Sequence, residues 1–346
     1  MEKRMLKFGI IGCGRIALKH AESIVALPEA ELVGVCDIVP ERARAFAEKY
    51  GAKPYVDYIE MLKNPEIDVI TVATPSDLHA PIGIAAAKAG KHVMVEKPMA
   101  MTLKSADELI AACREAGVKL AVIHQNRFNK SIKLMRTALN DGRFGKLTHG
   151  QATVRWNRDD NYYAQAPWRG TKLQDGGVLM NQSIHNIDLL QWMFGPVESV
   201  FGYTTTMLRK IEMEDIGVAV LKFKSGALGI IEAASTIYPK NIEETLNVFG
   251  ETGSVMVGGI AVNRIETWEF QDSEQEKAEI FASQENDPPN VYGFGHREII
   301  LDMIQAIWEE RPPAVPGEEG RKALEIILSI YKCQETGMPV VLPLRE

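Results

Sequence analysis

Two side chains of this 346-residue chain have the type and setting needed to exchange a proton with an alcohol. Lys97 lies in the segment Glu96–Pro98, directly after an apolar run, and the proline restricts the backbone there. His185 lies near the start of a helical pattern. A desolvated lysine, or a histidine kept neutral by a helix N-terminus, can accept a hydroxyl proton. The alternatives are a solvated surface pair at Glu96 and Lys97 and a hydrogen-bonded core histidine at position 185.

A glycine turn near the start of the chain is typical of a dinucleotide phosphate site. Residues 7–17 read K-F-G-I-I-G-C-G-R-I-A, an apolar strand followed by G-x-G-x-x-A and a helical pattern. Gly12 allows the tight turn, and Gly14 lets the backbone approach a pyrophosphate. We expect Gly12, Gly14, Arg15 and Ile16 to contact the cofactor. A glycine turn in an unrelated sheet is the alternative.

Asp37 ends the next apolar run, about 20 residues beyond the glycines. A carboxylate at that strand end accepts hydrogen bonds from ribose hydroxyls and repels a 2′-phosphate, so Asp37 favours NAD over NADP. Asp37 could instead only cap its strand, and the nearby Arg42 and Arg44 leave NADP open.

Further cofactor contacts are expected where later strands end, because dinucleotides bind outside the carboxyl ends of parallel strands. Thr74 and Pro75 follow the apolar run that begins at Asp68. His79 lies just beyond them and is either a cofactor contact or a helix-start histidine without a ligand. Glu96 and Lys97 follow the next run and complete the expected set.

Basic and aromatic side chains gather between residues 155 and 172, ahead of His185. Guanidinium groups can hold a diphosphate bidentately, and aromatic rings can stack on a sugar or a base. The residues that we expect to bind substrate there are Arg155, Arg158, Tyr163, Trp168 and Arg169. The alternative is a set of surface ion pairs and a subunit contact.

The elements that must position these residues follow two patterns. Strand and helix patterns alternate up to about residue 123, which predicts a Rossmann-type doubly wound parallel sheet. Ser105 and Glu108 form a predicted capping box for a helix that runs to Ala116. Beyond His124, longer strands with period-two alternation and turns at residues 224–226 and 251–253 predict an antiparallel sheet with helices on one face.

The predicted fold is therefore α/β, with a dinucleotide-binding domain at residues 1–123 and a substrate-binding and oligomerisation α+β domain at residues 124–346. Within the second domain, Asn181 is expected on the same helix face as His185, four residues later. A final helix at about residues 320–335 can pack back on the first domain. The polar stretch 271–289 is expected to be a loose loop. The apolar stripes predicted for the two helices are Ile184, Ile187, Leu190 and Phe194, and Ala323, Ile326, Ile327 and Ile330.

Composition narrows the class of protein. A net charge of −7 argues against affinity for nucleic acid or anionic membranes, and no run approaches the roughly 20 apolar residues of a membrane span. The N-terminus lacks a signal-type apolar stretch, so we expect a cytoplasmic protein. The scattered cysteines, which lack metal-ligand spacing, are expected to be reduced and buried, with neither a disulfide nor a metal: Cys13, Cys36, Cys113 and Cys333.

Together, the G-x-G-x-x-A turn, the E-K-P segment and the glycine pair followed by H-x-x-D resemble the Gfo/Idh/MocA oxidoreductase family over essentially the whole chain. The resemblance implies NAD-dependent oxidation of an alcohol, with Lys97 and His185 meeting a small-molecule substrate beside the nicotinamide. In the family the proline of this segment is often preceded by a cis peptide bond, so the resemblance implies one before Pro98. It also implies assembly into homodimers or homotetramers through the second sheet, which is common among members.

One position departs from the common family pattern. Many members carry an aspartate four residues before the histidine, whereas this chain has Asn181, which cannot ionise. With Asn181 as a substrate contact, the chain looks more like the branch that oxidises the 3-hydroxyl of UDP-N-acetylglucosamine or UDP-N-acetylglucosaminuronate in surface-polysaccharide pathways. An inositol or aldose dehydrogenase is the second possibility. A non-catalytic NAD(H)-binding protein is the third, and it leaves Lys97 and His185 without a role.

Overall fold

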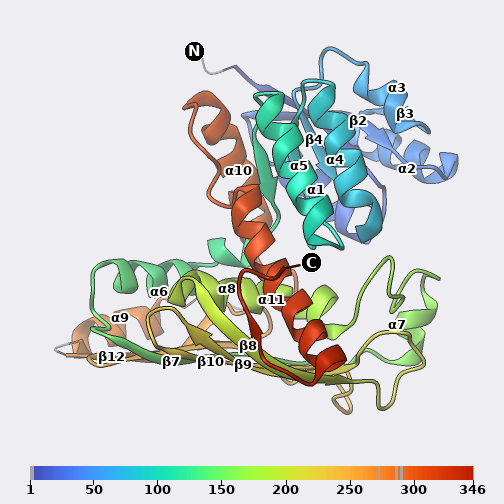
Figure 1. Ribbon diagram of the computed structural model, residues 1–346. Coiled ribbons are helices and arrows are strands. Elements are labelled where there is room, and N and C mark those ends of the chain that lie inside the picture. Colours follow the sequence, from blue (N-terminus) through green and yellow to red (C-terminus); the bar gives the residue numbers. More distant parts are fainter. Residues whose placement is uncertain (1–3, 272, 285–286, 289–290, 346) are drawn as a thin grey trace. The chain divides into compact units, whose positions relative to one another are not determined.

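A computed structural model describes residues 4–271, 273–284, 287–288 and 291–345 (Figure 1). The chain divides into two compact units. One holds the chain up to His124 together with His296–Arg321, and the other holds Gln125–Gly295 and the chain from Lys322 onward. The expected boundary near residue 123 thus coincides with the first crossing between units, while residues 296–321 join the first unit rather than the second.

The first unit is built on a six-stranded parallel sheet in the order β3-β2-β1-β4-β5-β6. This order reverses between β1 and β4, as in a doubly wound dinucleotide-binding fold. Its strands are β1 (Leu6–Ile11), β2 (Ala30–Cys36), β3 (Lys53–Tyr55), β4 (Val69–Val72), β5 (His92–Val95) and β6 (Leu120–Val122). Its helices are α1 (Arg15–Val25), α2 (Pro40–Tyr50), α3 (Tyr58–Leu62), α4 (His79–Lys88), α5 (Leu103–Glu115) and α10 (Gly295–Trp308), with the 3-10 turn η1 (Ser76–Leu78).

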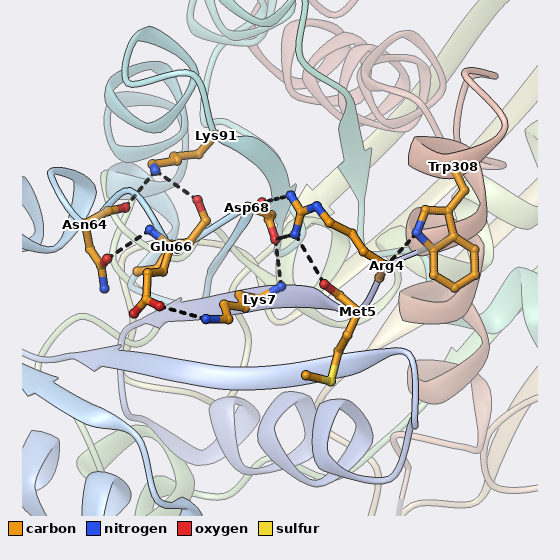
Figure 2. A network of polar contacts seen from close by, with 9 residues as sticks. Arg4, Met5, Lys7, Asn64, Glu66, Asp68, Lys91 and Trp308 are labelled. Carbon is orange, nitrogen blue, oxygen red and sulfur yellow. Dashed lines mark hydrogen bonds and ion pairs between the residues drawn. The ribbon is translucent and has the colours of Figure 1, made fainter. Parts of the chain in front are cut away.

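A polar network ties down the amino ends of β1 and β4, away from the edge where the cofactor is expected (Figure 2). Arg4 pairs with Asp68 at 2.5 Å, and the Lys7 amide donates to the same carboxylate at 2.9 Å. Trp308 of α10 donates its indole N–H to the Arg4 carbonyl at 3.0 Å. This bond joins the late helix α10 to the segment just before β1, in agreement with the place of His296–Arg321 in the first unit.

The second unit contains an eight-stranded sheet in the order β13-β12-β11-β7-β10-β9-β8-β14, in which β7 and β10 run parallel and the other neighbours antiparallel. Its strands are β7 (Leu147–Arg155), β8 (Val197–Thr205), β9 (Ile216–Phe223), β10 (Leu228–Ala234), β11 (Glu243–Gly250), β12 (Gly253–Gly258), β13 (Arg264–Phe270) and β14 (Val340–Val341). Its helices are the 3-10 turn η2 (Gln125–Phe128), α6 (Lys130–Asn140), α7 (Asp160–Ala164), the π-helical turn η3 (Val178–Gln182), α8 (Ile184–Phe194), α9 (Glu274–Ala282) and α11 (Gly317–Thr336).

The predicted fold class is confirmed by these two sheets, and so are the two predicted apolar stripes. Ile184, Ile187, Leu190 and Phe194 of α8 are all at most 5% exposed, and the four residues predicted for α11 are at most 1% exposed. Most of α11 belongs to the second unit, where Cys333 and Tyr331 bond to residues of that unit; only residues 317–321 pack with the first.

Two local expectations were wrong. The helix α5 begins earlier than the capping box at Ser105 and Glu108 predicts, because Thr102 is the N-cap and accepts the Ser105 amide at 3.1 Å. The polar stretch 271–289 is not a loop throughout, because α9 occupies Glu274–Ala282 and Glu276 bonds to Arg143 and Trp268. Residues 272, 285–286 and 289 of that stretch lie outside the described residues.

All four cysteines are buried free thiols, and burial raises the pKa of Cys13, Cys36 and Cys113 to about 12. None of the helices within the described ranges is both long enough and apolar enough to cross a membrane.

Candidate active site

The glycine turn after β1 has the geometry that a pyrophosphate requires. Gly12 adopts φ +96°, and a Cβ there would lie 2.5 Å from the Ala73 carbonyl oxygen. Gly14 is the N-cap of α1 and makes no side-chain cap. A Cβ on Gly14 would meet nothing within 4 Å, so glycine leaves open space beside the helix N-terminus. Arg15 and Ile16 open α1, and their backbone amides belong to this N-terminus.

Asp37 supports this turn as well as ending β2. One carboxylate oxygen accepts the Cys13 amide at 2.9 Å and the other accepts the Val39 amide at 2.8 Å. The strand-capping alternative is therefore realised. Since a carboxylate can accept about four hydrogen bonds, Asp37 also retains acceptor capacity for ribose hydroxyls.

Thr74 and Pro75 follow β4 by two and three residues, and Pro75 precedes the turn η1. The Thr74 hydroxyl oxygen is buried and has no hydrogen-bond partner among the described residues. A buried hydroxyl normally finds a partner, so Thr74 and the open space at Gly14 both fit a bound dinucleotide. Residues on the first unit would thus hold NAD by the glycine turn, Asp37 and the Thr74 segment, and NAD would supply a hydride acceptor.

His79 begins α4 and is buried, as the helix-start alternative expects. Its Nδ1 lies 2.7 Å from the Pro98 carbonyl and its Nε2 lies 2.8 Å from the Thr74 carbonyl. The ring therefore lies between the two segments that follow β4 and β5, and in its neutral form it donates its one N–H to one of these carbonyls. Burial lowers the pKa of His79, although the two carbonyls act in the opposite direction. A direct contact between His79 and the cofactor stays a prediction.

Glu96 is 5% exposed, so the solvated-pair alternative is wrong for the carboxylate of the E-K-P segment. One Glu96 oxygen lies 2.7 Å from His20 Nε2 of α1, and the other accepts the Lys97 amide at 3.2 Å. The peptide bond between Lys97 and Pro98 is cis. Lys97 itself is half-buried. The backbone that carries its ammonium group is thus held by hydrogen bonds on either side.

In the second unit, His185 is the second residue of α8. Asp188, one turn later, forms a bidentate ion pair with Arg127 of η2 at 2.7 and 2.6 Å, and the two side chains are 0% and 3% exposed. Arg127 also lies 4.8 Å from the Trp192 ring centroid. The aspartate of the H-x-x-D pattern therefore holds the helix that carries His185.

Asn181 does not share a helix face with His185 as predicted. It lies in the π-helical turn η3, which ends before α8 begins, so the spacing of four does not correspond to one α-helical turn. The Asn181 amide nitrogen donates to the buried Asp175, and its oxygen accepts from Gln182 at 2.7 Å. A carboxylate is thus present one hydrogen bond away from position 181, although Asn181 itself cannot ionise.

Some of the predicted substrate residues gather around one aromatic ring, and the others lie apart from it. Tyr162 is the centre of the cluster: Arg158 and Arg169 lie over its ring at 5.1 and 4.2 Å, and its hydroxyl accepts from Gln182 at 3.0 Å. Arg158 also lies 4.5 Å from the Trp156 ring centroid. The Nε atoms of Arg158 and Arg169 are buried without a hydrogen-bond partner among the described residues.

Trp168, Tyr163 and Arg155 stand in three different settings. Trp168 carries Arg169 over its ring at 4.7 Å, and Tyr163 pairs with Ser235 at 3.2 Å, where burial raises its pKa to about 12. Arg155 instead forms ion pairs with Glu232 and Glu243, in line with the surface-pair alternative. A substrate contact for each of them stays a prediction.

Two buried glutamates of this unit were not anticipated. Burial raises the pKa of Glu214 to about 7, and one of its oxygens accepts the Leu179 amide of η3 at 2.9 Å. Burial raises the pKa of Glu244 on β11 to about 8, and Asn126 donates to it at 3.3 Å. The sequence gives no local signal of this burial, because Glu214 has Glu212 and Asp215 close by and Glu244 follows Glu243, and charged segments of this kind are usually exposed.

Comparison with known proteins identifies a family domain in each unit. Residues 6–124 match a family model described as an oxidoreductase family with an NAD-binding Rossmann fold, and residues 132–256 match the GFO/IDH/MocA C-terminal domain. The WlbA dehydrogenase from Bordetella pertussis, solved with NADH and UDP-GlcNAcA, is 39% identical with a TM-score of 0.91, covering 99% of this chain and 100% of that one.

The WlbA dehydrogenase from Chromobacterium violaceum, solved with the same two ligands, is also 39% identical, with a TM-score of 0.92, covering 100% of this chain and 98% of that one. A myo-inositol 2-dehydrogenase of Thermotoga maritima is 29% identical over 334 residues, which are 92% of this chain and 93% of the relative.

Proposed function

The chain belongs to the Gfo/Idh/MocA family of NAD-dependent oxidoreductases, and from this membership we propose that it oxidises the 3-hydroxyl of a UDP-N-acetylhexosamine or of its uronate. The observation that carries the proposal is the full-length likeness, at 39% identity, to two dehydrogenases crystallised with NADH and UDP-GlcNAcA. The presence of Asn181 in place of an aspartate supports the same assignment.

The cluster around Tyr162 supports an anionic substrate. Arg158 and Arg169 bring two guanidinium groups to one aromatic ring, and each has a buried Nε–H available. Burial lowers the pKa of Arg158, which means that its cation is only partly compensated by its surroundings. A diphosphate or carboxylate would supply that compensation through charge-assisted hydrogen bonds.

In the proposed reaction, Lys97 or His185 takes the proton of the substrate hydroxyl. The other side chain donates a hydrogen bond to the oxygen as negative charge develops there. Bound NAD would accept the hydride from the carbinol carbon. Glu96, His79 and Asp188 would act only through the side chains and backbone that they hold.

A cyclitol or free-sugar dehydrogenase is the second candidate, favoured by the 29% identity to the T. maritima myo-inositol 2-dehydrogenase. The two candidates differ in the nucleotide. A polyol carries no anionic group, so a polyol dehydrogenase should oxidise its substrate equally well without the Arg158 guanidinium. A nucleotide-sugar dehydrogenase should need that guanidinium to bind the diphosphate.

A panel assay tests the proposal. NAD and stoichiometric enzyme are mixed with UDP-N-acetylglucosamine, its uronate, free sugars or inositols; NADH absorbance and the product mass are both read, so that NADH retained on the enzyme is still detected. We expect oxidation of a UDP sugar. We also expect the KM of Arg158→Gln to be at least about tenfold higher than that of wild type, because losing a hydrogen bond to a charged group costs about one to two kcal/mol. Arg264→Gln, which removes an arginine paired with Asp287, is the matched control. A response to free polyols alone would overturn the nucleotide-sugar assignment.

We also propose that the protein forms a homodimer or homotetramer through the open face of its second sheet. Neighbouring strands present apolar side chains there, since Val220 of β9 is paired with Ile230 of β10 and with Phe201 of β8. Val218, Val220, Leu228 and Ile230 are 39–56% exposed. A contiguous apolar patch of this kind is typical of an interface.

A further inference from the structure

The first unit contains a buried cluster of His20, Glu96 and His296, contributed by α1, the segment after β5, and α10. The three side chains are 0%, 5% and 4% exposed by residue. His20 Nε2 lies 2.7 Å from Glu96 Oε1, and the His20 and His296 rings meet edge to face with centroids 5.4 Å apart. Glu96 immediately precedes Lys97 and accepts its amide at 3.2 Å, so the cluster contacts the backbone of the proposed acid-base lysine through Glu96.

We propose that His20 is a positioning residue for Lys97: its Nε2–H holds one oxygen of Glu96, so that the other oxygen holds the Lys97 amide and the carboxylate charge stays next to the lysine. The proposal rests on the role of Lys97 given above. His20 lies 77 residues from Lys97 in the sequence and contacts it only through Glu96. His20 is therefore not itself a catalytic residue.

The charges around Glu96 support this arrangement. Burial alone would raise the pKa of Glu96, but the hydrogen bond from His20, together with the nearby positive charge of Lys97, outweighs burial and lowers the pKa to about 2. Burial lowers the pKa of His296 to about 3, so His296 is a neutral wall of the cluster. The titratable groups that face Glu96 are thus His20 from α1, His296 from α10, His79 from α4 and Lys97 from its own segment.

Coulomb interactions are reciprocal, so the Lys97 charge that stabilises the Glu96 carboxylate is stabilised by that carboxylate in return. Removing the His20 donor leaves Glu96 buried without its main partner, and a buried carboxyl without a partner takes up a proton. Loss of His20 and loss of the Glu96 charge should therefore change the proton affinity of Lys97 in the same direction. Both should let the Lys97 amine lose its proton at a lower pH.

The ligand atoms of the same three side chains lie within 4.8 Å of one another, so a metal ion is the alternative occupant of the cluster. The distance between His20 and Glu96 favours a shared proton over a metal ion. Two ligands of one tetrahedral zinc ion lie about 3.3 Å apart, given bonds of about 2.0–2.2 Å. The separation of 2.7 Å between His20 and Glu96 is that of a charge-assisted hydrogen bond.

The test follows the titration of Lys97 without relying on any substrate. The purified full-length protein is treated with a trace of acetic anhydride across a pH series, and the acetylation of Lys97 is quantified by mass spectrometry. We compare wild type with His20→Leu, which cannot donate, His20→Gln, whose amide replaces Nε2–H, and Glu96→Gln. His92→Leu is the matched control, because His92 is a histidine on β5 whose ring accepts the Lys119 amide at 2.9 Å and has no bond to Glu96.

We expect the labelling midpoint of Lys97 to fall by about one pH unit, a tenfold change in proton affinity, in His20→Leu and Glu96→Gln. His20→Gln and His92→Leu should keep the wild-type midpoint. Thermal melting of each variant separates folding defects from this effect, and Glu96→Gln carries the test if His20→Leu does not fold. A wild-type midpoint in folded His20→Leu or Glu96→Gln would overturn the proposal. So would one equivalent of metal in wild type that is lost in His20→Leu.

Lys97→Met distinguishes this inference from the proposed function. Full turnover in Lys97→Met would remove the catalytic role of Lys97, while the labelling series would still report whether His20 and Glu96 control its charge in the other variants. Loss of turnover in Lys97→Met together with an unshifted labelling midpoint would leave the proposed function standing and reject the role of His20 alone.

Discussion

Lys97 and His185 each come from a rigidly held segment, so their substitution should affect proton transfer more than folding. We predict that Lys97→Met and His185→Ala each lower kcat by at least about 100-fold, the usual contribution of a general acid or base. The affinity for NADH should change by no more than about twofold, because the glycine turn and Asp37 remain intact.

Steady-state rates and NADH fluorescence titrations check this prediction. Lys104→Met and His149→Ala are suitable controls, since both side chains are exposed and lie outside the proposed site. Full activity in both Lys97→Met and His185→Ala would reject the assignment of the proton-transfer residues.

Asn181 donates to its buried neighbour Asp175, so an aspartate at position 181 should be destabilising. Asn181→Asp would place two carboxylates together in a buried site, and one of them would have to take up a proton. The folded-state pKa of the pair would then be raised, so stability would be lost as the pH rises. We expect Asn181→Asp to lower the melting temperature more at pH 8 than at pH 5; equal shifts at both pH values would contradict this account.

A buried ion pair between Asp188 and Arg127 ties the helix α8 to η2 in the second unit. Asp188→Asn leaves the Arg127 cation buried without its charge partner, which typically costs about 3–5 kcal/mol. Urea unfolding should show a loss of this order. The matched control is Glu198→Gln, which breaks an exposed pair with Lys222 and should cost no more than about 1 kcal/mol. Similar losses in the two variants would show that Asp188 is not the main anchor of α8.

The strand β11 carries the buried Glu244, whose pKa of about 8 gives stability a pH dependence. The folded state binds a proton that the unfolded glutamate releases above its ordinary value of 4.5, so this contribution is full below about pH 4.5 and is lost as the pH rises toward 8. Glu244→Gln keeps the acceptor for Asn126 but cannot ionise.

We expect Glu244→Gln to match wild type near pH 5 and to become more stable than wild type by an amount on the order of 1–3 kcal/mol near pH 8.5. The measurement is the difference in free energy of unfolding between the two proteins at each pH. A difference that stays constant with pH would mean that Glu244 is ionised in the folded protein.

The exposed apolar face of the second sheet governs how whole chains associate. Val220→Lys combined with Ile230→Lys places two charges at the centre of that face without touching the buried face of the sheet. We expect a shift from oligomer to monomer in light scattering coupled to size-exclusion chromatography. Val25→Lys, at an exposed position on α1, is the control. A variant with the wild-type mass would exclude this face as the interface.

In both units, local sequence patterns predict the strands and helices but not every long-range contact between them. The parallel sheet, the hairpins and the apolar stripes of α8 and α11 were predictable because each depends on the spacing of apolar residues within a short window. The crossing of the chain back into the first unit at His296 was not, because it depends on contacts such as that of Trp308 with Arg4, which are 304 residues apart.

Short motifs within single segments were enough to predict the dinucleotide turn at Gly12 and Gly14, the position of Lys97 after a buried strand, and the family. Three features became visible only in the folded chain: Glu96 is buried against His20, Asp188 anchors α8 through Arg127, and Asn181 lies in a π-helical turn against Asp175. Each of these depends on the desolvation of a charged or polar group by segments distant in the chain. Burial of that kind leaves no periodic trace in the amino-acid sequence.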